Sequence, residues 1–178
     1  MKEMVKIVNK NHPALRAPAQ PVNPSWFGSA KLKKVVTDMS RALATQKDGV
    51  ALAAPQIGLS LQIFVVSGRI LSTTKDDPQT APASDLVFIN PKITRLSKTK
   101  QDMEEGCLSV RWFYGQVRRA TKATIEAHNL DGKKFSYSGS GLMAQIFQHE
   151  TDHLNGVLFT DKAKKLRQLK PVRAKHAS

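Results

Sequence analysis

The sequence has a single cysteine among its 178 residues, which limits the chemistry that thiols can support. One cysteine excludes an intramolecular disulfide, and it excludes zinc ribbons and iron–sulfur clusters, which need several thiolates. Long apolar runs are also absent, and none approaches the roughly 18 residues of a membrane-spanning helix. Charged side chains at Lys2, Glu3 and Lys6 come too early for the apolar core of a signal peptide. We therefore expect a protein of a reducing compartment that does not enter a membrane.

Acidic residues are few, with 14 aspartates and glutamates against 28 lysines and arginines, so the net charge is +14. About half of this charge lies between Lys162 and Lys175, where seven basic residues occur without an acidic one. Clustered cations of this kind either belong to a solvent-exposed terminal helix or contact a polyanion such as a phosphate backbone. The segment has no aromatic residue for base stacking, and the chain has no zinc-finger or RNA-binding motif. We expect no sequence-specific binding of nucleic acid.

The remaining composition is that of one folded domain, because 40% of the residues are hydrophobic and 24% are charged. Local patterns predict an α+β fold in which antiparallel sheets pack around a central helix. We expect a single domain over residues 1–165 and a basic tail over residues 166–178. A basic C-terminal helix is expected as the third helix of the chain.

Residues 11–24 hold four prolines, which favours an extended segment that wraps the domain. Apolar residues at helical spacing predict one helix over Ala30–Lys47 and the central helix over Ser140–Asn155. A polar, proline-containing stretch predicts a mobile surface loop over residues 68–85. Strands are expected over Leu61–Ser67, Leu86–Ile89, Lys122–His128 and Lys134–Tyr137, of which the last two form a hairpin.

The predicted central helix carries an H-E-x-x-H motif that begins at His149. Its apolar stripe runs through Leu142 and Ile146 and continues into both histidines, so the two imidazoles are expected to face the interior. Two inward imidazoles one turn apart, from His149 and His153, can bind one metal ion. Glu150 beside them can accept a proton from water. The alternative is a helix with two hydrogen-bonded histidines and a surface glutamate.

A catalytic site of the zinc type usually has a third protein ligand, whose identity separates reaction classes. In one group of metalloproteases this ligand is a histidine, which would fall at Phe159 in this chain. No glutamate follows His153, and the other downstream candidates are Asp161 and His176, the latter in the basic tail. A protease therefore lacks its third ligand here.

Upstream, the lone Cys107 offers a thiolate as the third ligand. An isolated cysteine is more often a small buried apolar side chain, but an incomplete histidine pair in the same chain favours a Cys-His-His site. Such a donor set suits iron(II), zinc, cobalt or nickel. A further segment, Gly49–Gly58, consists of small residues and contains Gln56, whose amide can donate to an oxyanion. The alternative for this segment is a packing surface.

Together these segments resemble the three motifs of the peptide deformylase family, whose members remove the N-formyl group from newly made proteins. The motifs are a glycine- and alanine-rich segment that ends in glutamine, an E-G-C-hydrophobic-S segment and a Q-H-E-x-x-H helix. Here they read Gly49–Gln56, Glu105–Ser109 and Gln148–His153, in the same order and at matching separations. The resemblance covers nearly the whole chain up to about Lys165.

The resemblance implies a role for each residue of the three motifs. The metal ligands would be one thiolate and two imidazoles, from Cys107, His149 and His153. Glu150 would be the general acid and base, and Gln56 with the backbone N–H of Leu108 would stabilise the oxyanion. Glu105 would be paired with Arg119. The substrate-binding surface would consist of five residues: Gly49, Val50, Ala51, Leu142 and Ile146.

The resemblance also implies a cofactor and partners. The cofactor would be one divalent ion, iron(II) in the cell, with zinc, nickel or cobalt in purified protein because a thiolate–iron(II) site is sensitive to oxygen. The substrates would be N-formylmethionyl nascent peptides. The protein would be located in the cytoplasm, as a bacterial-type enzyme rather than an organellar one. A ribosome contact through Lys162–Lys175 follows as a hypothesis, and no membrane partner is expected.

The chain departs from the family pattern at three places, none of which is a metal ligand or the general acid and base. Ala51 stands where the family has a second glycine, and its methyl group would lie where the substrate backbone approaches. Residues 111–114 replace a segment that usually contains a proline, and Gln145 occupies a helix position that is often apolar.

Two alternative functions remain open. One alternative is an H-E-x-x-H metallopeptidase, which would cleave unformylated peptides and tolerate Cys107→Ser. The other is a deformylase-like binding protein in which Ala51 weakens or blocks turnover.

Overall fold

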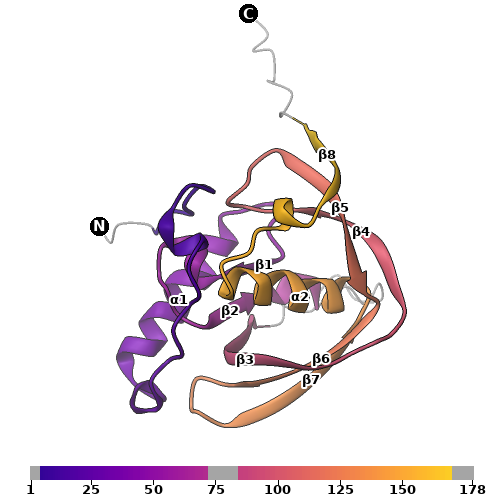
Figure 1. Cartoon of the computed structure of the whole chain (residues 1–178). Coiled ribbons are helices and arrows are strands. Elements are labelled where there is room, and N and C mark those ends of the chain that lie inside the picture. The colour runs from indigo at the N-terminus through magenta and orange to yellow at the C-terminus, as the bar shows by residue number, and fades with distance from the viewer. Residues whose placement is uncertain (1–4, 72–83, 170–178) are drawn as a thin grey trace, which may run out of the picture.

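The structure is a computed structural model, and it describes residues 5–71 and 84–169. These residues form two α-helices, α1 (Ala30–Ala44) and α2 (Leu142–Leu154), and eight strands (Figure 1). The strands are β1 (Ala51–Ala53), β2 (Ile63–Val66), β3 (Leu86–Leu96), β4 (Lys100–Gly106), β5 (Phe113–Ala120), β6 (Lys122–His128), β7 (Lys134–Ser140) and β8 (Lys164–Gln168). A short 3-10 helix, η3 (Ala54–Ile57), follows β1 directly.

The eight strands form two sheets, and neighbouring strands in both are antiparallel. The larger sheet has the order β1-β2-β3-β6-β7, and the smaller sheet has the order β4-β5-β8. Helix α2 contacts β1, β3, β6 and β7 of the larger sheet and β5 of the smaller one, and Figure 1 shows it in the middle of the molecule. The predicted α+β fold, with antiparallel sheets around the helix that carries the H-E-x-x-H motif, is confirmed. Over the ranges that the structure describes, no helix has both the length and the apolar character needed to cross a membrane.

Side chains that alternate along β1, β2 and β3 give the larger sheet two apolar faces. One face packs against α1 in a buried cluster that includes Leu32, Met39, Leu52, Val65 and Ile89. The opposite face packs against α2 in a second buried cluster that includes Ala51, Phe64, Phe88, Ile146 and Phe147. Strand β1 lies at the edge of this sheet and contributes side chains to both clusters. The edge strand is therefore held from two sides.

The proline-rich segment 11–24 wraps the domain and joins parts of it that are distant in the sequence. The Ala19 N–H donates to the Leu154 carbonyl at 2.8 Å, at the end of α2. The Val22 N–H donates to Asn90 Oδ1 at 2.7 Å, within β3. The segment therefore ties the last turn of α2 to the larger sheet.

Most of the predicted elements are present, with shifted ends. The first helix ends at Ala44 rather than Lys47, where a tighter hydrogen bond from the Gln46 N–H to the Leu43 carbonyl replaces the helical one. The predicted hairpin corresponds to β6 and β7, and the strand predicted to end at Ile89 continues to Leu96. The sequence pattern does not predict strands β4 and β5.

The prediction of a basic C-terminal helix is wrong within the described residues, because Lys164–Gln168 forms β8. All five side chains of this strand are exposed, so a helix here would have no apolar face to bury. The backbone pairs instead with β5, where Tyr114 lies opposite Arg167. Strand β8 also crosses the expected domain boundary after residue 165. Residues 170–178, and most of the loop predicted over residues 68–85, lie outside the described residues.

Phe88 lies in the aromatic core between β3 and α2, where its ring stacks on Phe64 at 4.6 Å and meets Phe147 edge-on at 5.4 Å. We expect Phe88→Ala to lower the free energy of unfolding by about 3–5 kcal/mol, because it removes a fully buried ring and leaves a cavity. Leu96→Ala on the same strand is the control, and its effect should stay below about 0.5 kcal/mol because that side chain is 46% exposed. Urea unfolding of both variants measures the difference. Equal losses would contradict this description of the core.

Candidate metal centre

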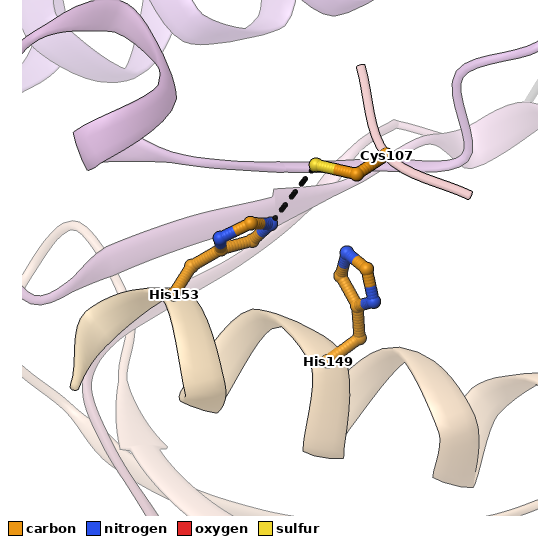
Figure 2. A group of neighbouring side chains, drawn as sticks. All are labelled: Cys107, His149 and His153. Carbon is orange, nitrogen blue, oxygen red and sulfur yellow. Dashed lines mark hydrogen bonds between the residues drawn. The ribbon is translucent and has the colours of Figure 1, made fainter. Parts of the chain in front are cut away.

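Three donor side chains from two distant segments converge beside α2 (Figure 2). His149 and His153 lie one turn apart on α2, and Cys107 directly follows β4. Their donor atoms lie within 4.8 Å of one another, and Cys107 Sγ is 3.3 Å from His153 Nε2. A thiolate and two imidazoles gathered in this way fit one divalent transition-metal ion.

The orientation of the His149 ring is set by a carboxylate on its other side. His149 Nδ1 donates a hydrogen bond to Glu105 Oε2 at 2.8 Å. This leaves Nε2 as the ring nitrogen that can bind a metal ion. Histidines that bind metals usually make this second hydrogen bond, because it selects the tautomer and fixes the plane of the ring. The His153 ring is placed differently, since its Nδ1 is buried without a partner among the described residues.

Glu105 is itself held by a buried arginine. Arg119 donates to Glu105 Oε1 from Nε at 2.7 Å and to Oε2 from Nη2 at 3.0 Å, which confirms the pairing that the sequence predicts. The same guanidinium donates from Nη1 to Asp152 Oδ2 at 2.7 Å, and Lys162 also binds Asp152. The two carboxylates and the two cations form one network that joins β4, β5 and α2.

This network favours the ionised forms that a metal centre needs. Burial alone would raise the pKa of Glu105, but hydrogen bonds from His149 and Arg119 lower it to about 2. Burial would also raise the pKa of the Cys107 thiol, whereas the charge of His153 and the hydrogen bond with His149 hold it well below its ordinary value. The thiolate is the form of cysteine that binds metals. The charge distribution therefore supports Cys107 as a ligand.

Glu150 follows His149 on α2 and is buried, contrary to the alternative of a surface glutamate. Its Oε2 has no hydrogen-bond partner among the described residues, and the side chain lines the pocket beside the three donors. Burial raises the pKa of Glu150 and outweighs the attraction of the neighbouring histidines. A buried carboxyl group with a raised pKa is suited to accept and return a proton.

The amide of Gln56, in η3, is oriented by the backbone next to it. Its Oε1 accepts a hydrogen bond from the Ala53 N–H at 2.8 Å, so its Nε2 is directed away from that strand. Nε2 lies 3.5 Å from Cys107 Sγ and 3.5 Å from Ser109 Oγ. The amide donor therefore faces the metal centre. The N–H of Leu108 makes no hydrogen bond to the residues that the structure describes.

A pocket of about 290 Å³ opens beside these groups. It is lined by Gln56, Leu108 and Glu150, by two of the metal donors, and by the five predicted substrate-binding residues: Gly49, Val50, Ala51, Leu142 and Ile146. Leu142 departs from the predicted buried stripe, because α2 begins there and the side chain is 51% exposed. The methyl group of Ala51 packs in the apolar cluster that contains Ile146. It therefore points from the face of the sheet toward α2 and not along the edge of β1.

Three acidic residues that shape this region have no role in the sequence-based prediction. Asp152 completes the Arg119 network, whereas Asp48 and Glu104 line the pocket. Asp152 follows His149 by three residues, which places the two side chains on nearly the same side of the helix. This spacing is the one feature of the sequence that indicates a role for Asp152 at the site. Gln145, one of the three departures from the family pattern, donates from Nε2 to the Glu104 carbonyl at 2.8 Å and so links α2 to β4.

The sequence and the fold are both similar to those of peptide deformylases from several organisms. A peptide deformylase from Psychrobacter cryohalolentis is 40% identical over 165 residues, which cover 93% of this chain and 82% of that protein. A peptide deformylase from Desulforudis audaxviator is 40% identical over 158 residues, with coverage of 89% and 92%. The crystal structure of a class I type b peptide deformylase from Acinetobacter baumannii with Met-Ala-Ser bound matches with a TM-score of 0.79 at 31% identity, covering 91% of this chain and 99% of that one. The polypeptide deformylase family model matches residues 4–169, which include both sheets and α2, and the chain therefore belongs to the polypeptide deformylase family.

Proposed function

We propose that the chain holds one divalent metal ion through Cys107, His149 and His153 and removes the N-formyl group from the formylmethionine at the start of newly synthesised polypeptides. One observation carries the proposal. Glu150, a buried carboxylate without a hydrogen-bond partner for its Oε2 among the described residues, lies next to three donor atoms that are within 4.8 Å of one another. The products are formate and a polypeptide with a free α-amine.

Glu150 moves the proton in this reaction. A divalent ion at the three donors would polarise the formyl carbonyl and lower the pKa of water. Glu150 accepts the proton that the attacking water loses while the water oxygen forms a bond to the formyl carbon. The carbon–nitrogen bond to methionine then breaks, and Glu150 returns the proton to the leaving α-amine. The raised pKa of Glu150 supports both transfers, because a carboxyl of ordinary acidity would hold the proton too weakly.

The negative charge that develops on the formyl oxygen needs hydrogen-bond donors that are already in place. We assign this role to Gln56 Nε2 and the Leu108 N–H. The hydrogen bond from the Ala53 N–H holds the Gln56 amide in the required orientation before the substrate arrives. Leu108 follows Cys107 directly, so its N–H is positioned by the same segment as the thiolate.

The substrate backbone is proposed to lie along the free edge of β1, next to Gly49, Val50 and Ala51. An edge strand offers unpaired N–H and C=O groups to an extended peptide. A Cβ at Gly49 would lie 2.8 Å from Leu43 Cδ1, so a larger residue there would require the Leu43 side chain to shift. The methionine side chain is placed against Leu142 and Ile146. The Acinetobacter baumannii relative was crystallised with Met-Ala-Ser bound, which supports a peptide as the ligand of this pocket.

The donor set supports a choice of metal, and the relatives support a choice of compartment. Iron(II) is proposed in the cell, and zinc, nickel or cobalt are accommodated by the same thiolate and imidazoles in purified protein. A cytoplasmic location of the bacterial type is proposed because bacterial relatives align over most of the chain. A tomato relative, 35% identical, is named as chloroplastic, and this chain covers 52% of that protein.

The first prediction of the proposed function concerns turnover. Protein prepared without oxygen and loaded with iron(II) should release formate from formyl-Met-Ala-Ser, measured with a coupled formate assay. Glu150→Gln should lower kcat at least about 100-fold, because general acid and base catalysis typically contributes that much. The variant keeps the shape of the side chain, so its metal content and thermal unfolding serve as checks on folding.

The outcome also separates the alternatives. Formate release that does not exceed that of Glu150→Gln would refute the proposed function and favour the binding protein that Ala51 suggests. Cleavage of unformylated Met-Ala-Ser would instead indicate an H-E-x-x-H metallopeptidase.

The second prediction concerns the third ligand. Cys107→Ala should weaken metal binding by more than about 100-fold. The loss of a residue that only hydrogen-bonds to a ligand already lowers metal affinity by up to about that factor, and the loss of a ligand should lower it further. Metal content after gel filtration, measured by mass spectrometry, should fall from about one ion per chain to well below it. Ser109→Ala in the same segment is the control and should keep its metal. An unchanged metal content in Cys107→Ala would show that another group completes the site.

The basic C-terminal segment is proposed to contact the ribosome, since a deformylase acts on nascent chains. In the described part of the segment, Lys162 and Arg167 pair with Asp152 and Glu104. Lys164 and Lys165 make no ion pair there, although both are exposed on β8. These two lysines are therefore available to phosphate groups.

The third prediction tests this interaction without disturbing β8. The double variant Lys164→Gln/Lys165→Gln should bind ribosomes more weakly in co-sedimentation. The slope of log affinity against log salt should fall by about 1 for each phosphate group that the variant no longer neutralises. Release of formate from the tripeptide should not change. Lys33→Gln/Lys133→Gln removes two exposed lysines elsewhere and is the control. If both double variants co-sediment like the wild type, β8 does not bind the ribosome.

A further inference from the structure

Two segments that contribute to the pocket lining are joined by the side chain of Arg111, which pairs with Asp48 at the partly exposed side of the pocket. We call these segments, residues 46–49 and residues 107–112, the two walls of the pocket mouth. Arg111 donates from Nη1 to Asp48 Oδ2 at 2.7 Å and from Nη2 to Gln46 Oε1 at 2.5 Å. Among the described residues, these are the hydrogen bonds that connect the two walls. Arg111 and Asp48 both line the pocket.

The first wall is also held from behind. Arg69 donates from Nη2 to the Gln46 carbonyl at 3.0 Å and to the Gly49 carbonyl at 3.1 Å. Arg69 therefore fixes the backbone of this wall, whereas Arg111 binds its side chains from across the pocket. The wall continues directly into β1, so its position decides where the edge of β1 lies relative to Cys107 and Leu108.

The second wall contains a strained residue next to Arg111. Trp112 has a φ of 68°, which is unfavourable for a bulky side chain and persists only where the surroundings hold it. Its carbonyl accepts a hydrogen bond from the Leu169 N–H at 2.8 Å, and the Arg111 guanidinium lies 5.2 Å from the centre of its ring. The side chain of Arg111 thus contacts both walls.

We propose that Arg111 is a positioning residue that fixes the width of the pocket mouth for an extended polypeptide. The inference rests on the proposed function and extends it to the part of the substrate beyond the formylmethionine. A groove that already has the right width spares the substrate the entropic cost of ordering its walls. The hydrogen bond from Arg111 lowers the pKa of Asp48, so the pair stays ionised at neutral pH. The residue acts at the mouth and not on the reacting atoms.

The test compares substrates of different length. Arg111→Ala should raise KM for formyl-Met-Ala-Ser about fivefold, which is a modest change because the broken pair is partly exposed, while kcat changes less than about twofold. KM for formylmethionine amide, which lacks the residues that would extend past the Arg111–Asp48 pair, should rise less. The Kd of the product Met-Ala-Ser, measured by calorimetry on metal-loaded protein, should rise in parallel with KM.

Asp48→Ala separates positioning from direct contact. If Arg111 acts through the walls, Asp48→Ala should reproduce the rise in KM, and the double variant should be no worse than Arg111→Ala alone. A wild-type KM in Asp48→Ala would overturn the inference, because Arg111 would then bind the peptide by itself. This variant also keeps the test valid if Arg111→Ala does not fold.

The matched control is the pair of Arg118 and Asp102, an ion pair between β5 and β4. Their charged groups lie 3.6 Å apart, their side chains are 61% and 45% exposed, and neither residue lines the pocket. Arg118→Ala should leave KM and kcat at wild-type values. If Arg111→Ala behaves in the same way while the wild type releases formate, the inference fails and the proposed function stands. If the wild type releases no formate, the proposed function itself fails.

Discussion

The buried ion pair between Glu105 and Arg119 holds the candidate metal centre together, because it joins three elements that are separate in the sequence. Glu105 lies on β4, Arg119 lies on the neighbouring strand β5, and Arg119 also binds Asp152 on α2. Glu105 Oε2 accepts a further hydrogen bond from His149. Buried charges are costly unless their hydrogen-bonding groups are satisfied, and both oxygens of Glu105 have partners. The pair therefore sets the distance between Cys107, which continues β4, and the histidines of α2.

Helix α2 can carry this site because its faces have different partners. Ile146 and Phe147 pack against the larger sheet, where the aromatic cluster holds the helix in place. Gln148 fixes its rotation, since its side-chain amide bonds both the N–H and the carbonyl of Ala120 on β5. With the apolar face and Gln148 in place, His149 is directed toward Cys107. The packing of the core and the geometry of the donors are thus decided by the same thirteen residues.

The site is more predictable from the sequence than the fold around it. Helical spacing alone brings His149 and His153 together, because it depends only on local geometry. Cys107 follows from the count of available ligands and from the family motif. Strand β4 escapes prediction because its two inward side chains are Met103 and Glu105, so no apolar alternation marks it. The lysines, arginine and leucine of the C-terminal strand favour a helix, and only the partner strand β5 overrides that preference.

Different parts of the pocket are built from different interactions, which differ in how deeply the charges are buried. At the metal end the charges are buried and paired, so a change in one group would leave an unpaired charge in apolar surroundings. Elsewhere on the pocket lining, Asp48 pairs with Arg111 and Glu104 pairs with Arg167, and both pairs are partly exposed and contribute little to stability. Residues there can change without loss of the fold. Two of the three departures, residues 111–114 and Gln145, line the pocket, whereas Cys107, His149 and His153 match the family motifs. Burial thus constrains the candidate metal centre more tightly than the partly exposed residues around the rest of the pocket.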